Sequence, residues 1–189
     1  MPVPAGGLRT KGWGGQVIER ELGADGGRGP DFAALGVELK SVPVTADLTP
    51  LESTAVCHID PVAIAGESWA TSYARTKLAR VLFVAVEVPE GARSVGERRV
   101  ASVRLWTPSA SEEAALRQDF ERFVRDYFRV GRAAQITGHL GAVMQVRPKA
   151  RNAADLRDAF GPDGRPVRLG KCGFYLRPAF VREILRAAG

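Results

Sequence analysis

Residues 81–86 form an uninterrupted apolar run, VLFVAV, that is rich in β-branched side chains. A membrane-spanning helix needs about 20 apolar residues, so this run is far too short to cross a bilayer. A short run of this composition is typical of a buried strand. The chain is therefore expected to fold around a sheet, and no transmembrane segment is predicted.

The clearest helix in the sequence begins after Ser109. Residues 109–112, SASE, have the spacing of a capping box, in which serine and glutamate satisfy the first free N–H groups. Apolar side chains then recur at helical spacing on one face, at Leu116, Phe120, Phe123, Val124, Tyr127 and Phe128. Five arginines lie mostly outside this stripe, and we expect a solvated face there, with contact to phosphate or a partner as the alternative: Arg117, Arg122, Arg125, Arg129 and Arg132.

Shorter periodic segments complete a mixed pattern. Helices are expected over residues 16–22, closed by Gly23, and over residues 152–160 and 180–186, and residues 67–80 lead into a further helix. Strands are expected over residues 35–42, 78–88, 139–147 and 173–176, with a turn at 161–164. Neither a repeat nor a linker divides the chain, so we expect a single α/β domain over residues 1–189.

The charge balance favours a polyanionic partner. Lysine and arginine total 27 against 21 acidic residues, which gives a formal net charge of +6. Only five of these cations are lysines: Lys11, Lys40, Lys77, Lys149 and Lys171. Because lysine is a compact point charge that can release its proton, a site that handles a proton or a single phosphate has reason to use it.

Cysteine, histidine and leader signals are weak. Cys57 and Cys172 are far apart in sequence and predict two buried, inert thiols. His58 and His139 are expected to be structural, not catalytic bases. The N-terminus has neither a basic n-region nor an apolar h-region, so a cytoplasmic location is expected.

The strongest chemical signal is Asp31 followed seven residues later by Glu38-Leu39-Lys40. On a strand, Glu38 and Lys40 point to the same side, so two carboxylates and an amine can converge. Magnesium prefers oxygen ligands and is satisfied by one or two carboxylates with phosphate oxygens. Taken alone, this spacing is also common on solvated strand faces.

The surrounding sequence resembles the MutH family of mismatch-repair endonucleases, which belongs to the restriction-endonuclease-like nucleases. Collinear segments carry the resemblance, and they span most of the chain: residues 11–15 (KGWGG), 31–40 (DFAALGVELK), 69–82 (WATSYARTKLARVL), 98–100 (RRV), 105–108 (LWTP), 146–150 (VRPKA) and 173–176 (GFYL). The implied fold is a mixed sheet flanked by helices, bilobed around a DNA cleft. Family members usually carry a longer segment before the KGW sequence, so a shorter N-terminal lobe is expected here.

The resemblance assigns roles to individual residues. Asp31 and Glu38 would bind metal, with Glu19 as an auxiliary metal-binding acid, and Lys40 would be the catalytic lysine. Lys77 would contact the scissile phosphate or couple catalysis to DNA binding. Arg147, Pro148 and Lys149 would form the DNA-reading loop, in which cations pair with guanine acceptors. Tyr175 would sense the adenine methyl group, and Lys11 would contact backbone phosphate.

The implied activity is a Mg²⁺-dependent endonuclease that nicks the unmethylated strand at hemimethylated GATC sites in double-stranded DNA. MutL would be its activator, and the enzyme is expected to be monomeric. Two alternatives stay open: a GATC restriction endonuclease that cuts both strands, and a DNA-binding module that has lost catalysis. An RNA-binding protein fits the charge but explains none of the motifs.

Overall fold

The computed structural model places the described residues in two compact units. It describes residues 13–24, 29–149, 152 and 154–187. Unit 1 comprises Met1–Thr54, Lys77–Thr107 and Pro178–Gly189, and unit 2 comprises Ala55–Thr76 and Pro108–Arg177. Within the described ranges, no helix combines the length and the apolar character that crossing a bilayer would require. Each unit is built around its own three-stranded sheet.

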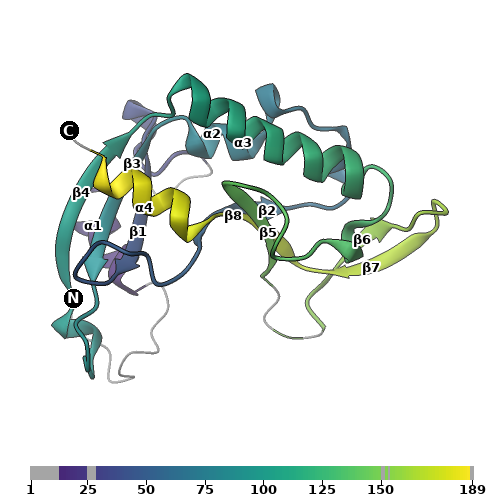
Figure 1. The fold of residues 1–189 in the computed structure, drawn as a ribbon. Coiled ribbons are helices and arrows are strands. Elements are labelled where there is room, and N and C mark those ends of the chain that lie inside the picture. The colour runs from purple at the N-terminus through teal and green to yellow at the C-terminus, as the bar shows by residue number, and fades with distance from the viewer. Residues whose placement is uncertain (1–12, 25–28, 150–151, 153, 188–189) are drawn as a thin grey trace. The chain divides into compact units, whose positions relative to one another are not determined.

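Unit 1 contains a mixed sheet in the order β1-β3-β4 (Figure 1). Strand β1 (Glu38–Val44) pairs in parallel with β3 (Val81–Glu87), and β3 pairs antiparallel with β4 (Arg99–Trp106). The apolar run of the sequence is thus the central strand, with Val81, Phe83 and Ala85 fully buried. The predicted α/β class and the predicted strand are confirmed.

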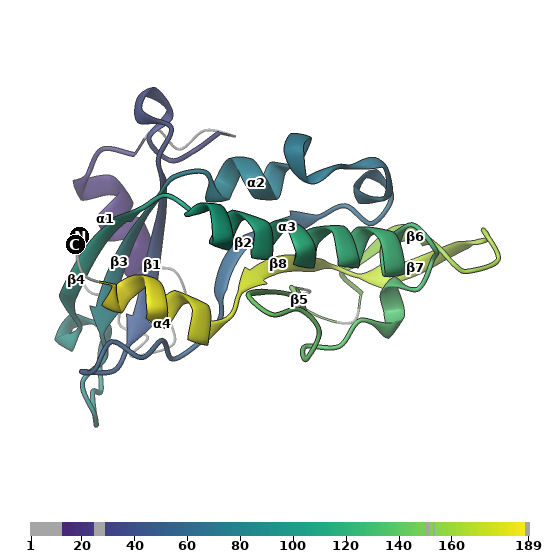
Figure 2. The ribbon, with the colours of Figure 1, turned by 45° about the horizontal axis from the view of Figure 1, so that its top comes forward.

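Helices α1 (Trp13–Glu21) and α4 (Pro178–Arg186) cover opposite faces of this sheet (Figure 2). Successive strand residues point to opposite faces, so Val84 and Phe83 lie on different sides. Ile18 of α1 packs against the cluster that contains Val84. On the other face, the ring of Trp106 lies 5.8 Å from Phe83 and 6.1 Å from Phe180 of α4. Both predicted terminal helices are therefore present.

Unit 2 contains a sheet in the order β2-β8-β5, one face of which is packed by helix α3. Its strands are β2 (Thr54–Ile59), β8 (Cys172–Leu176) and β5 (Met144–Pro148). The predicted capping box at Ser109 opens α3 (Ala110–Phe123), which continues as a π-helical segment, Val124–Phe128. Phe174 of β8 lies 5.5 Å from Phe120 and 6.2 Å from Phe123, measured between ring centroids. The predicted apolar stripe is this buried face.

A buried carboxylate on α3 holds the loop that leads into β5. Asp119 is 4% exposed and accepts the N–H groups of residues 142–144 at 2.8–2.9 Å. The guanidinium of Arg177 donates to three carbonyls of the same loop, at residues 138, 140 and 141. Gly141 has φ +86°, and a Cβ there would lie 1.9 Å from the Met144 carbonyl oxygen, so this position requires glycine.

The predicted helix over residues 152–160 is wrong. Strand β6 (Leu156–Phe160) forms a hairpin with β7 (Pro166–Gly170). The turn at 161–164 is present, with Gly164 at φ +74° and the Gly161 N–H bonded to the Arg165 carbonyl. Alanine, leucine and arginine favour a helix locally. The turn lets the segment pair with a following strand, and that pairing overrides the local preference.

Candidate active site

A tight reversal before β1 brings Asp31 back to the strand that carries Glu38. Residues 32 and 37 form an antiparallel bridge around the 3₁₀ turn Ala33–Leu35. Gly36 closes this turn at φ +61°, a conformation that suits glycine. Asp31 then accepts the backbone N–H of Leu39 through Oδ2 at 2.8 Å. The spacing of seven residues therefore reflects a turn that places the two carboxylates beside the same strand.

Glu38 lies between two lysines. Its Oε1 is 2.6 Å from Lys40 Nζ, and its Oε2 is 2.7 Å from Lys77 Nζ. Glu38 is only 3% exposed and Lys77 only 8% exposed, so this ion pair is screened little by water. Lys77 Nζ also donates to the Gly29 carbonyl at 2.7 Å, which ties the segment before Asp31 to the site.

Lys77 reaches Glu38 because of a short helix and a parallel strand pair. Helix α2 (Tyr73–Leu78) begins after Ser72, whose hydroxyl accepts the Arg75 N–H as an N-cap. The helix ends just before β3, which pairs in parallel with β1 so that Glu38 is opposite Val81. The start of β3 and the start of β1 are therefore neighbours, which places Lys77 beside Glu38.

Glu19 of α1 belongs to the same electrostatic environment. Burial raises the pKa of Glu19, the charges of Asp31 and Glu38 raise it further, and Lys40 opposes the shift. Helix α1 packs on β1 at Gly15, where a Cβ would lie 3.7 Å from Ser41 Cβ, an ordinary van der Waals distance. Asp31, Glu38, Lys40 and Lys77 are thus brought together, and Glu19 interacts with three of them through its charge.

The side chains of this cluster offer hard oxygen donors. Three carboxylates face two ammonium groups, so the five ionised side chains carry one net negative charge. Neither a thiol nor an imidazole is among them, and carboxylate oxygen suits Mg²⁺, Mn²⁺ or Ca²⁺ better than zinc. Among the described residues, no group of three or more acidic, histidine or cysteine side chains is arranged closely enough to hold a metal. Both oxygens of Glu38 are instead bonded to lysines.

The candidate DNA-reading residues lie on the sheet of unit 2. Arg147 and Pro148 end β5, Lys149 follows directly, and Tyr175 is on β8. Arg147 is paired with Gly173, and Tyr175 with Gln145, so these side chains share the face opposite the one that α3 packs. Lys149 Nζ lies 5.9 Å from the Tyr175 ring centroid, a cation–π distance. Lys11 lies outside the described residues.

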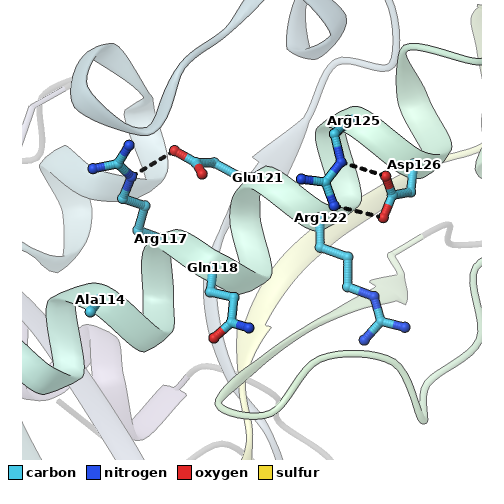
Figure 3. A pocket seen from close by; sticks show the side chains of 7 residues that line it. All are labelled: Ala114, Arg117, Gln118, Glu121, Arg122, Arg125 and Asp126. Atoms are coloured by element: carbon cyan, nitrogen blue, oxygen red, sulfur yellow. Dashed lines mark hydrogen bonds and ion pairs between the residues drawn. The ribbon is translucent and has the colours of Figure 1, made fainter.

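A second surface feature, a hollow on α3, offers no catalytic group. It is lined by one run of residues, shown in Figure 3: Ala114, Arg117, Gln118, Glu121, Arg122, Arg125 and Asp126. Two of its arginines are paired with acids of the same helical run, Arg117 with Glu121 and Arg125 with Asp126, each at 2.7 Å. Such exposed pairs are typical of a solvated helix face, the first of the two expectations for these arginines.

Sequence reasoning missed two backbone groups of the site. The Leu39 N–H fixes Asp31, and the Gly29 carbonyl anchors Lys77. A backbone atom has no signature in the residue type, so no sequence signal identifies either group. Only the fold shows that the site depends on the main chain as well as on the acids and lysines.

Comparison with known proteins identifies the family of this chain. The family model described as "DNA mismatch repair enzyme MutH" matches residues 22–119. The chain is 43% identical to the DNA mismatch repair protein MutH of Vibrio cholerae serotype O1 (strain ATCC 39315 / El Tor Inaba N16961), over 98% of this chain and 84% of the relative. It is 42% identical to that of Pectobacterium atrosepticum (98% and 80%) and 40% identical to that of Haemophilus ducreyi (97% and 81%). The chain belongs to the MutH family.

Proposed function

We propose that this DNA mismatch repair endonuclease nicks the unmethylated strand at hemimethylated GATC sites, with a divalent metal and with MutL as activator. The observation that carries the proposal is the position of Glu38, buried between Lys40 and Lys77 on the strand that also fixes Asp31. A surface charge pattern would not bury a carboxylate with two ammonium groups at 2.6–2.7 Å. This arrangement supports catalysis and argues against a silent binding module.

The chain's own residues account for orientation and charge. Lys40 Nζ would hold the attacking water in line with the phosphorus and stabilise charge as the water loses its proton. Lys77 Nζ would neutralise the phosphate oxygens while the bond from phosphorus to the leaving oxygen breaks. Because both lysines also contact Glu38, the carboxylate sets the position of both ammonium groups.

The metal we propose is Mg²⁺. Asp31, Glu38 and Glu19 would hold it, because they supply hard oxygen donors with a net negative charge. When bound, the ion lowers the pKa of water and stabilises the charge that develops on phosphorus. Each oxygen of Glu38 accepts from one lysine and keeps a second lone pair that could contact the ion.

The face of the unit 2 sheet opposite α3 would read the DNA. Arg147 and Lys149 are donors that match guanine acceptors in the major groove, and Pro148 restricts the backbone between them. Tyr175 lies under Lys149, where an aromatic ring is suited to contact a methyl group. A DNA cleft between two lobes and a phosphate contact by Lys11 stay predictions. The monomeric state, the cytoplasmic location, the single domain and the shorter N-terminal lobe also stay predictions.

Replacing Lys40 with alanine tests the catalytic assignment. We expect Lys40→Ala to bind a GATC duplex as the wild type does and to lose cleavage, because its role is confined to the chemical step. Arg117→Ala is the control, since Arg117 pairs with Glu121 on the solvated face of α3 and should leave both binding and cleavage intact. Cleavage by Lys40→Ala at the wild-type rate, under the same metal concentration, would refute the assignment.

The substrate assignment is tested with a supercoiled plasmid that carries one GATC site. The plasmid is prepared unmethylated, hemimethylated and fully methylated, and is incubated with Mg²⁺, with and without MutL. Nicking confined to unmethylated strands and stimulated by MutL is the expected result. Linear product without MutL would instead support a restriction endonuclease, and binding without any cut would support the inactive module.

A further inference from the structure

Cationic side chains gather at one end of the unit 2 sheet, where β5 ends and β8 begins. Lys149 follows β5, and its backbone N–H donates to the Lys171 carbonyl at 2.7 Å. The N–H of Lys171, just before β8, donates to the Asp155 carbonyl at 3.1 Å. Arg157 lies on β6, beside Asp155 at 3.5 Å. Three chain segments are thus joined through backbone bonds and an ion pair at this edge.

His58 on the outer strand β2 belongs to this group. The neighbouring carbonyl of Cys57 approaches β8 so closely that a Cβ on Gly173 would lie 2.5 Å from it. The same Cβ would lie 3.6 Å from Cδ of Lys149, so the lysine stem passes over Gly173, near Cys57. The side chain of His58 is exposed.

The electrostatic surroundings of His58 are mostly positive. Partial burial lowers the pKa of His58, and Lys149, Lys171 and Arg157 lower it further, while Asp155 alone opposes them. An imidazole beside three cations gains a proton more readily once an anion binds, because the anion offsets part of the local positive field. The cluster is therefore suited to an anionic ligand.

We propose that His58, Arg157 and Lys171 extend the Lys149 surface into a phosphate-binding patch, where His58 takes up a proton as a DNA backbone phosphate binds. This inference rests on the proposed function in one respect, that the substrate is duplex DNA. Phosphate contacts of this kind position a protein on DNA without reading its sequence. The patch would hold the duplex while Arg147 and Lys149 contact the bases.

The direction of the pH effect follows from linkage. Bound phosphate raises the pKa of His58 above its value in the free protein, so between the two pKa values the complex holds a larger fraction of a proton than the separate molecules. Affinity therefore rises as the pH falls from 8 towards 5.5. A difference of about one pKa unit between the free and bound forms would change the dissociation constant by up to about tenfold.

The test is duplex binding between pH 5.5 and 8, measured in EDTA with a hemimethylated GATC duplex so that cleavage cannot interfere. The wild type and His139→Gln should bind more tightly at low pH, because His139, also exposed, lies outside the patch. His58→Gln should bind with little pH dependence. Calorimetry in buffers of different ionisation enthalpy should show proton uptake by the wild type that is lost in His58→Gln.

Salt dependence tests the lysine of the patch. Lys171→Ala should reduce the slope of log affinity against log salt by about 0.9, the value for one lost phosphate contact. Unchanged pH dependence in His58→Gln, or an unchanged salt slope in Lys171→Ala, would overturn the patch. If the wild type takes up a proton on binding DNA but does not nick the GATC plasmid, the proposed function is refuted and the patch is still supported.

Discussion

Replacing Lys77 with methionine should destabilise the protein far more than breaking an exposed ion pair of the same length. Lys77 and Glu38 are 2.7 Å apart, with side chains 10% and 5% exposed. Removing one partner of a buried pair costs about 3–5 kcal/mol, because the other charge is left in a poor solvent. Lys40 still contacts the second oxygen of Glu38 at 2.6 Å, so we expect the lower end, about 3 kcal/mol.

The assay is equilibrium urea unfolding in EDTA, so that no divalent ion replaces the lost charge. Arg117→Met is the matched control: Arg117 and Glu121 are also 2.7 Å apart, but their side chains are 62% and 43% exposed. That variant should lose only about 0.3–0.5 kcal/mol. The Glu38→Gln/Lys77→Met double variant should lose less than the sum of the two single losses. A loss below about 1 kcal/mol for Lys77→Met would refute the buried ion pair.

Three further substitutions test other parts of the structure. Asp119→Asn should lower the free energy of unfolding in urea by about 2–4 kcal/mol, because the new NH₂ group meets backbone N–H donors. Asp126→Asn should be nearly neutral, and equal losses in the two variants would contradict this expectation. Gly173→Ala should lower the free energy of unfolding by about 1–3 kcal/mol and weaken duplex binding, because the alanine Cβ meets the Cys57 carbonyl. Wild-type behaviour in both assays would argue against that contact. Hydrogen bonds from threonine hydroxyls and two arginine charges lower the pKa of Asp47 to about 2. The wild type should therefore be more stable than Asp47→Asn above pH 4, and this difference should vanish as the pH falls through 2. A stability difference that persists at pH 1.5 would be inconsistent with this reading.

The parts of the fold that could be predicted are those with a strong local signal. The β-branched run of β3 and the capping box of α3 both identify an element from a few adjacent residues. Strand β6 and the hairpin it makes with β7 carried no such signal, because residues 152–160, which include β6, have helical propensity. Their strand conformation depends on pairing across a turn, and composition does not encode pairing.

The candidate site was predictable in its residues and not in its contacts. The spacing of Asp31, Glu38 and Lys40 indicated a possible cluster, but only the family resemblance assigned their roles. Lys77 followed from the resemblance alone, since it lies 39 positions from the Glu38 that it contacts. The burial of Glu38 between two lysines could not be foreseen, because burial arises from tertiary packing. The apolar stretch around His58 likewise favoured a structural role, and only the neighbouring strand ends showed its cationic surroundings.

The order in which unit 1 is synthesised has a consequence for how the newly made chain folds. Strands β1, β3 and β4 come early in the chain, but α4 (Pro178–Arg186), which packs against Trp106 through Phe180, is synthesised after all of unit 2. The parallel pairing of β1 with β3 is also a non-local step, which forms slowly because a long loop must close first. A nascent chain that ends before α4 therefore leaves one face of this sheet without its helix, and unit 1 completes its packing only after unit 2 has been made.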